Sequence, residues 1–151
     1  MIYARRGWPA LLGILAALYF VGLPRGAADL GDLARELGLR DVEGFVETVE
    51  TVCRTGRLPE RYLTKREARA RGWRPGRDLC AVAPGRAIGG DRFGNRERRL
   101  PEASGRIWYE ADLDFACGRR GPKRLVFSDD RLVFVTLDHY RSFRRVPCPD
   151  E

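Results

Sequence analysis

The sequence is poor in residues that bind metals. Its 151 residues include one histidine, His139, and four cysteines, at positions 53, 80, 117 and 148. No two cysteines have the C-x-x-C spacing of common zinc sites. This scarcity argues against a zinc site.

Acidic residues are also in the minority. Twenty-one Asp and Glu stand against 28 Lys and Arg, which gives a net charge of +7 and a pI of about 9.7. Such a charge fits an acidic partner, namely nucleic acid, a membrane surface or an acidic protein, but it names none of them. Arginine as a simple solubilising residue is the alternative. The length fits one domain with extra segments.

Charge is absent from "GWPALLGILAALYFVGL" (7–23), which follows the basic start "MIYARR". Small residues near Ala28 complete the layout of a secretory signal peptide, residues 1–28. Cleavage near Ala28 would remove three arginines, leaving 28 − 3 = 25 cations against 21 acids, or +4. An uncleaved membrane anchor is the alternative, because Arg25 interrupts the cleavage region, although the run is shorter than the ~20 residues of a spanning helix.

An even number of cysteines in an exported domain indicates two disulfides. Four cysteines allow three pairings, and the spacing alone does not choose among them.

Helical patterns occupy the first half of the chain. Residues 29–43 are acidic with leucines at helical spacing, and Phe45, Val49 and Val52 share one face of an amphipathic helix over 44–54, which ends at a glycine. The segment 29–43 could cap the fold, cover a basic groove or serve as a linker. Farther on, the Thr64-x-x-Glu67 pattern predicts a capping box.

Strand patterns occupy the second half. Apolar and polar residues alternate over 106–115, and "KRLVFS" and "RLVFVTL" read as a hairpin joined at "SDD". Helices followed by strands predict an α+β fold with N-terminal helices packed on a C-terminal antiparallel β-sheet.

The 106–115 strand carries the first candidate chemistry. Glu110, Asp112 and Asp114 alternate along it and should share one face, and the segment 119–124 supplies three arginines and a lysine. The acids could be ordinary solvated surface residues, or they could be neutralised by the cations. They could also frame a phosphate site with one carboxylate left as a base, and His139 beyond the next strand would suit phosphodiester chemistry.

Several ordered motifs decide between these alternatives. They are "LPERYLTKREARARGW", "VAPGRAIGGDRFGNRERRLP", "SGRIWYEAD", "KRLVFSDD" and "TLDHYRSF". From about Leu58 to Val146 the chain thereby resembles the barnase-type microbial ribonucleases, small secreted bacterial enzymes that prefer guanosine. The resemblance implies the microbial ribonuclease fold, with residues 44–151 as the ribonuclease domain and 29–43 as an extension outside it.

The resemblance also implies roles for residues. Glu110 matches the general base and His139 the general acid, so activity should follow a bell-shaped pH curve. Lys65, Arg120 and Arg124 match the cations that meet the charge on the phosphoryl oxygens. The matching substrate-binding residues are Phe93, Gly94, Asn95, Arg96, Glu97 and Tyr140. Amides around Asn95 face the guanine carbonyl and the Glu97 carboxylate accepts from the guanine edge, which is exposed only in unpaired RNA.

Placing the cysteines on the family fold implies the pairs Cys80–Cys117 and Cys53–Cys148. Arg119 and Arg131 stand where relatives have aromatic residues, and we expect both to add charge near the site. Gly94 replaces a serine, with little loss expected.

Other polar and aromatic positions carry structural expectations. Asp112 should pair with Arg120 or Arg124, and Arg106 should pair with Asp130. Trp73 and Trp108 should be buried, Asp91 should tie loops together and Asn95 should shape its loop.

These features predict a secreted, metal-independent endoribonuclease, monomeric, that cleaves single-stranded RNA on the 3′ side of guanosine. A cyclic phosphate forms first and is then hydrolysed. Family resemblance further implies a small acidic inhibitor protein of the barstar type. The alternatives are a non-catalytic binding module on the same fold and a membrane-anchored protein that binds acidic polymers. Retention of both a base and an acid favours the enzyme.

Overall fold

The computed structural model describes residues 25–149, so the apolar run of the predicted signal peptide lies outside the described residues. The helices are α1 (Arg25–Glu36), α2 (Val42–Thr55), α3 (Lys65–Ala70) and the 3₁₀ helix η1 (Leu79–Ala81). The strands are β1 (Tyr62–Leu63), β2 (Ala87–Phe93), β3 (Trp108–Asp112), β4 (Arg124–Ser128), β5 (Val133–Thr136) and β6 (Arg144–Val146). Within residues 25–149, no helix has the length and apolar character needed to cross a membrane.

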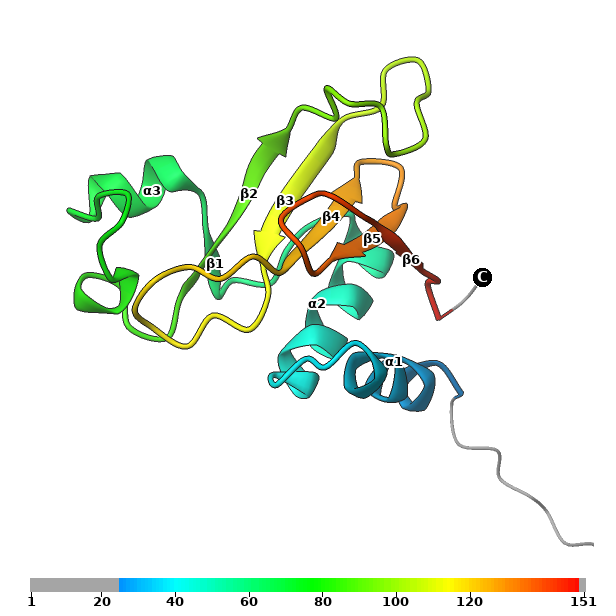
Figure 1. The fold of residues 1–151 in the computed structure, drawn as a ribbon, viewed down its shortest axis with the longest axis horizontal. Coiled ribbons are helices and arrows are strands. Elements are labelled where there is room, and N and C mark those ends of the chain that lie inside the picture. Colours follow the sequence, from blue (N-terminus) through cyan, green and yellow to red (C-terminus); the bar gives the residue numbers. More distant parts are fainter. Residues whose placement is uncertain (1–24, 150–151) are drawn as a thin grey trace, which may run out of the picture.

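The described strands form one six-stranded sheet in sequence order (Figure 1). Pairing is antiparallel from β2 to β6, and the short β1 joins β2 in parallel. The predicted α+β class is therefore confirmed, as is the hairpin between β4 and β5. The strand expected over 106–115 is shorter, 108–112, because the chain turns at Asp114 with φ of +56°.

The two faces of the sheet have different neighbours. Helices α1 and α2 pack against one face, where Phe45, Val49 and Val52 of α2 meet Leu125 and Phe127 of β4 in the main core. Because side chains alternate along a strand, the other face receives the remaining residues of β3 and β4. That face holds a smaller apolar cluster around Leu100, Trp108 and Val126, together with Glu110 and Asp112. The candidate site therefore lies on the sheet face opposite α1 and α2.

The segment before α2 is part of the packed structure. Leu30 and Ala34 of α1 are buried in the main core, and α1 lies against α2 (Figure 1). Glu36 of α1 pairs with Arg144 of β6 at 2.9 Å. Helix α2 begins at Val42 with an Asp41 cap, slightly before the predicted start, and ends at Gly56 in the left-handed conformation that the sequence pattern predicts.

Asp114 anchors the α1–α2 connection. Its carboxylate accepts from the backbone amides of Arg40 and Asp41 at 2.9–3.1 Å and from Lys123 Nζ at 2.7 Å. Burial by itself would raise the pKa of Asp114, but these hydrogen bonds outweigh it and lower the pKa. Asp114 therefore does not share a face with Glu110 and Asp112, and that expectation is wrong because the strand ends before it.

Strand β2 contains a bulge near its contact with α3. The register of the β2–β3 pair shifts between Gly89 and Asp91, and Gly90 has φ of +94°, which favours glycine. Asp91 accepts from the amide of Lys65 at 2.8 Å, so it ties α3 to the sheet as predicted.

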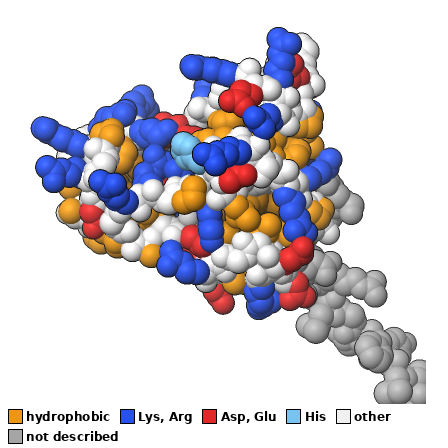
Figure 2. All heavy atoms as spheres, viewed as in Figure 1, with side chains coloured by type: hydrophobic (Ala, Val, Ile, Leu, Met, Phe, Trp, Pro, Cys, Tyr) orange, Lys and Arg blue, Asp and Glu red, His pale blue; other side chains and the backbone are white. Residues whose placement is uncertain are grey.

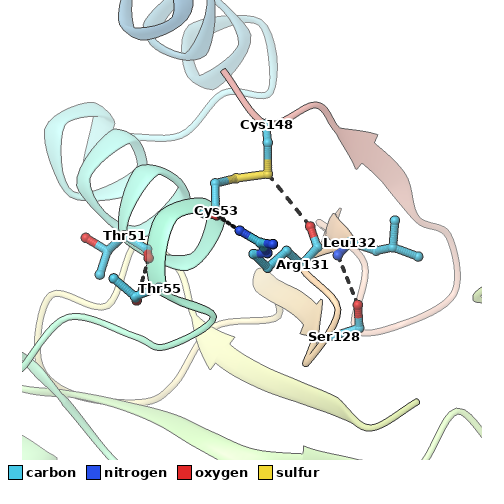
Figure 3. Close-up of a disulfide and its surroundings, with 7 residues drawn as sticks. All are labelled: Thr51, Cys53, Thr55, Ser128, Arg131, Leu132 and Cys148. Atoms are coloured by element: carbon cyan, nitrogen blue, oxygen red, sulfur yellow. Dashed lines mark hydrogen bonds between the residues drawn. A yellow bond between two sulfur atoms is a disulfide. The ribbon is translucent and has the colours of Figure 1, made fainter. Parts of the chain in front are cut away.

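Two disulfides, Cys53–Cys148 and Cys80–Cys117, close the structure, and these are the pairs that the resemblance implied. Figure 3 shows Arg131 beside Cys53–Cys148. Its guanidinium donates to the Cys53 carbonyl at 3.5 Å, at the turn end of the β4–β5 hairpin. The expectation that Arg131 adds charge near the site is therefore wrong, because the hairpin turn points to the C-terminal end of α2.

Candidate active site

Glu110 is the central carboxylate of the face opposite α1 and α2. Only 8% of the surface of Glu110 is exposed. Lys65 Nζ, at the start of α3, donates to Glu110 Oε1 at 2.8 Å, and the hydroxyl of Tyr140 donates to Oε2. Burial would raise the pKa of Glu110, but the hydrogen bonds from Lys65 and Tyr140 and the nearby charge of Arg124 lower it. The carboxylate is thus held ionised within a largely buried site.

Local sequence explains how Lys65 reaches this position. The Thr64 hydroxyl accepts from the Glu67 amide and caps α3, and the Glu67 carboxylate accepts from the Thr64 amide. The predicted capping box is therefore confirmed. Lys65 is the first residue of the helix and lies beside the Asp91 tie to β2. The helix start is therefore fixed on two sides, and the lysine side chain extends over the sheet to Glu110.

Asp112 is neutralised by two arginines, as predicted. Arg120 makes a bidentate pair with it at 2.6 Å for each bond, and Arg124 Nε lies 3.0 Å from Oδ1. Asp112 and Arg124 are directly opposite in the β3–β4 register. Because Asp112 is only 3% exposed and both its oxygens are engaged, it positions the arginines and is not a free base.

His139 lies in a strained loop after β5. His139 and Tyr140 have φ values of +58° and +70°, a conformation that costs energy for residues other than glycine. Asp138 holds the loop: it accepts from the amides of Arg141 and Ser142 at 3.0 Å and from the Ser142 hydroxyl at 2.6 Å. These hydrogen bonds lower the pKa of Asp138 to about 2, and the bond from the Ser142 hydroxyl contributes most.

Tyr140 joins the two halves of the site. Its ring stacks on Phe93 at 5.1 Å between centroids and lies 4.8 Å from the ring of His139. Burial is the largest cause that raises the pKa of Tyr140, and the hydrogen bond to Glu110 raises it further. The hydroxyl therefore keeps the proton that it donates. The tyrosine therefore connects Glu110, the aromatic end of β2 and His139.

The 93–97 loop borders a pocket of about 490 Å³. Phe93, Gly94, Asn95, Arg96, Glu97, His139 and Tyr140 all line it. Asn95, with φ of +40°, shapes the loop as expected, because its side chain exchanges two hydrogen bonds with the backbone of Leu100 at 3.0 and 3.1 Å. A Cβ at Gly94 would meet its nearest atom at 3.5 Å, so the loop has room for a serine.

Arg99 and Arg141 also line this pocket, and the sequence reasoning missed both. Arg99 Nε donates to Glu97 Oε2 and its NH1 group donates to the Arg141 carbonyl, each at 2.6 Å. Arg99 thus joins the 93–97 loop to the loop of His139. No local pattern separates Arg99 from its arginine neighbours, since the contact depends on a residue far along the chain.

The structure brings together Glu110, Lys65 and Tyr140 by direct contact, with Arg120 and Arg124 on the adjacent Asp112. Arg119 is exposed on the loop before Arg120. The structural expectations elsewhere are confirmed: Arg106 pairs with Asp130 at 2.6 Å, and Trp73 and Trp108 are buried.

Among the described residues, the one cluster of metal-ligand types is Asp78, Cys80 and Cys117. Both sulfurs belong to a disulfide and are not thiolate ligands.

Comparison with known proteins gives the family. A family model described as ribonuclease matches residues 46–147. The chain is 47% identical to a ribonuclease of Heyndrickxia coagulans over 106 residues, which cover 70% of this chain and 97% of that protein. It is equally similar, at 47% over 106 residues, to ribonucleases of Bacillus intermedius and Bacillus pumilus, of which the match covers 65%. Matches of this extent, together with the fold and motifs above, show that the chain belongs to the barnase-type bacterial ribonuclease family.

Proposed function

We propose that the protein is an endoribonuclease that cleaves single-stranded RNA on the 3′ side of guanosine. The observation that carries the proposal is Glu110: it is buried and held ionised by Lys65 and Tyr140 beside the arginines of Asp112. Tyr140 links this carboxylate to the pocket of His139 and Glu97. A base, an acid and convergent cations are the requirements of phosphodiester transesterification.

In the first step, Glu110 takes the proton from the ribose 2′-hydroxyl, and the 2′-oxygen attacks the adjacent phosphorus. The bond to the 5′-oxygen breaks, and His139 gives that oxygen its proton. The products are a 2′,3′-cyclic phosphate and a free 5′-hydroxyl. In the second step, His139 deprotonates a water molecule and Glu110 protonates the departing 2′-oxygen. No cofactor or metal takes part in these proton transfers.

Cations stabilise the charge that gathers on the phosphoryl oxygens. Lys65 is 31% exposed in its side chain, so it can turn from Glu110 to a substrate phosphate. Arg120 is 23% exposed and pairs with Asp112 through Nε and NH2, so it can meet a phosphate without leaving that pair. Arg124 is 5% exposed and hydrogen-bonded to the carbonyls of Gly121 and Lys123 at 2.6 and 2.8 Å, so it is fixed before substrate binds. Fixed donors stabilise developing charge without reorganisation.

Guanine selection is assigned to the 93–97 loop. The Glu97 carboxylate is 72% exposed at the pocket and has lone pairs for the ring N–H and the amino group of guanine. Adenine has a ring nitrogen that accepts at the position where guanine has its ring N–H. The Glu97 carboxylate would therefore face another acceptor and form no hydrogen bond there. The nucleophile is a 2′-hydroxyl, so DNA should not be cleaved.

The remaining proposals concern the chain as a whole. Two disulfides fit an oxidising compartment, and we propose export through a signal peptide over residues 1–28. The division into an extension (29–43) and a ribonuclease domain (44–151), the monomeric state and a small acidic inhibitor protein also remain proposals.

The test is turnover of the dinucleotides GpU, ApU and CpU by the wild type, Glu110→Gln and His139→Ala. We expect GpU to be preferred, and each variant to lower kcat/KM for GpU by about 100-fold or more, since one proton-transfer group is lost. Wild-type kcat/KM should fall in acid only below the ordinary glutamate pKa of 4.5, because the pKa of Glu110 is lowered. This fall of kcat/KM at low pH should be absent in Glu110→Gln.

Glu47→Gln is the matched control, because Glu47 is an exposed carboxylate on α2. It should leave turnover unchanged. Equal rates for the three dinucleotides would reject guanine selection. Full activity of His139→Ala would reject the proposed proton donor, and binding of RNA without any turnover would identify a binding module.

A further inference from the structure

A second cationic region lies outside the pocket. The segment 65–78, "KREARARGWRPGRD", contains six cations and two acids, so it carries +4 of the chain's net charge of +7. We call its five exposed arginines the arginine surface; they are Arg66, Arg69, Arg71, Arg74 and Arg77. Among the ion pairs within 4.0 Å in residues 25–149, none involves these five side chains.

The two acids of the segment are engaged elsewhere. Glu67 accepts from the amide and hydroxyl of Thr64 at 2.8 Å, and Asp78 accepts from the amides of Cys80 and Gly118 at 3.0 and 2.8 Å. Neither carboxylate is paired with an arginine of the surface at hydrogen-bond distance within the described chain. The positive charge of the surface is therefore left for a partner.

The backbone that carries the arginine surface is held in place. The capping box begins α3, and Trp73, 4% exposed, donates through its indole nitrogen to the Arg77 carbonyl at 2.9 Å. The Cys80–Cys117 disulfide then joins the segment to the loop of Arg120. A rigid platform loses little backbone freedom when a ligand binds, so each contact contributes more to affinity.

The arginine surface begins next to Lys65, one of the proposed catalytic cations. Lys65, whose ammonium contacts Glu110, is the residue immediately before Arg66. In Figure 2, lysine and arginine side chains gather over the α3 end of the molecule and extend to the histidine, shown in pale blue. A chain of phosphates lying over this end would lead directly to the phosphate that is cleaved.

The composition of the surface favours a phosphate backbone over a membrane. Helices that lie on membranes insert apolar side chains. Here Ala68 and Trp73 are buried, and among residues 25–149 the one exposed large hydrophobic residue is Leu137, outside the segment. Guanidinium groups bind phosphate in bidentate geometry, and phosphate contacts need no base sequence.

We propose that the arginine surface binds phosphates of the RNA chain beyond the dinucleotide that is cleaved, so that long RNA is bound more tightly than short RNA. This inference rests on the proposed function. It makes this end of the molecule a sequence-independent subsite whose contribution depends on substrate length and on salt.

The experiment compares kcat/KM for GpU with kcat/KM for a uridine 20-mer that contains one guanosine. The test variant is Arg69→Gln/Arg74→Gln/Arg77→Gln. The matched control is Arg35→Gln/Arg54→Gln/Arg57→Gln, which removes the same charge from exposed positions on and after α1 and α2. GpU cannot extend over α3, so the ratio of the two values corrects for folding and chemistry.

We expect the ratio of 20-mer to GpU turnover to fall about tenfold in the test variant and to stay near the wild-type value in the control. The slope of log affinity against log salt should fall by about 1 to 2, since each lost phosphate contact contributes ~0.7 for single strands. An unchanged ratio, or an equal fall in both variants, would overturn the proposal.

Binding measurements separate this proposal from the proposed function. Fluorescence anisotropy uses the same 20-mer with 2′-deoxyguanosine, which lacks the nucleophile and reports binding even if the wild type turns over no GpU. Weaker binding by the test variant alone supports the proposal. A test variant that keeps oligomer binding but loses binding to vesicles of equal parts phosphatidylglycerol and phosphatidylcholine would assign the surface to a membrane and reject the proposal.

Discussion

Two carboxylates on β3, those of Glu110 and Asp112, differ in the side chains that contact them. Glu110 contacts the partly exposed side chains of Lys65 and Tyr140. Asp112 is locked by Arg120 and by the buried Arg124. Two acids two positions apart are therefore held differently: Glu110 by partly exposed side chains, and Asp112 by a bidentate arginine and a buried one.

Arg99 provides a prediction at the residue scale. It connects Glu97 to the Arg141 carbonyl, so we expect Arg99→Gln to loosen Glu97, the proposed guanine acceptor, and to raise the dissociation constant of 3′-GMP by about two- to fivefold. The effect is modest because the pair is exposed, and such pairs contribute ~0.2–1 kcal/mol. Isothermal titration calorimetry measures it.

Arg98→Gln is the control, since Arg98 lies in the same loop and pairs instead with Glu102 at 3.5 Å. Equal effects of the two substitutions would mean that Arg99 acts only through its charge and not through its contacts with Glu97 and Arg141. Tighter binding by Arg99→Gln would mean that the arginine competes with guanine for Glu97.

At the scale of elements, the two disulfides connect different parts of the fold. Cys53–Cys148 ties α2 to the end of the described chain, beside Arg131 of the β4–β5 turn. Cys80–Cys117 ties η1 to the loop that carries Arg119 and Arg120. The first encloses a sequence separation of 95 residues and the second of 37.

We therefore expect the paired serine variants to differ in kind. Loop-closure entropy gives about 5 kcal/mol for the long loop and about 4 kcal/mol for the short one, as upper estimates. Cys53→Ser/Cys148→Ser should lose more stability in urea unfolding yet keep kcat/KM for GpU within about twofold. Cys80→Ser/Cys117→Ser should lose less stability but lower kcat/KM severalfold, because the Arg120 loop is released. Full activity of the second variant would show that the Asp112 pair alone positions Arg120.

At the scale of the whole molecule, acid should destabilise the fold. The pKa values of six described carboxyl groups are lowered by hydrogen bonds and nearby cations; they are Glu36, Glu67, Glu110, Asp114, Asp130 and Asp138. A lowered folded pKa contributes stability that is present above the unfolded value, 3.8 for aspartate and 4.5 for glutamate, and is lost as the pH falls through the folded value.

The free energy of unfolding should therefore change little near neutrality and decrease below about pH 4.5, which urea titrations at several pH values would measure. Asp114→Asn should cost about 1–3 kcal/mol at pH 7, since it removes the charged acceptor of the hydrogen bonds from Arg40, Asp41 and Lys123, and less at pH 3. Equal stability of the wild type at pH 3 and pH 7 would contradict this account, as would an Asp114→Asn variant with an unchanged acid dependence.

Local signals predicted much of the fold. The capping box at Thr64, the glycine end of α2 and the alternation along β3 depend on residues a few positions apart, and the structure contains all three. The sequence erred where a distant contact decides. The strand over 106–115 was expected to continue, but it ends before Asp114, which turns to the α1–α2 connection. Arg131 follows the hairpin turn toward Cys53.

The sequence by itself determined that helices precede strands, the ribonuclease family and the choice of Glu110 and His139 as candidate site residues, because periodicity, caps and motifs are properties of neighbouring residues. Tertiary structure alone decided which side chains hold Glu110, that Arg99 reaches the loop of His139, and that the five arginines of the arginine surface are exposed. The physical reason is that each of these contacts joins segments whose separation only packing can close.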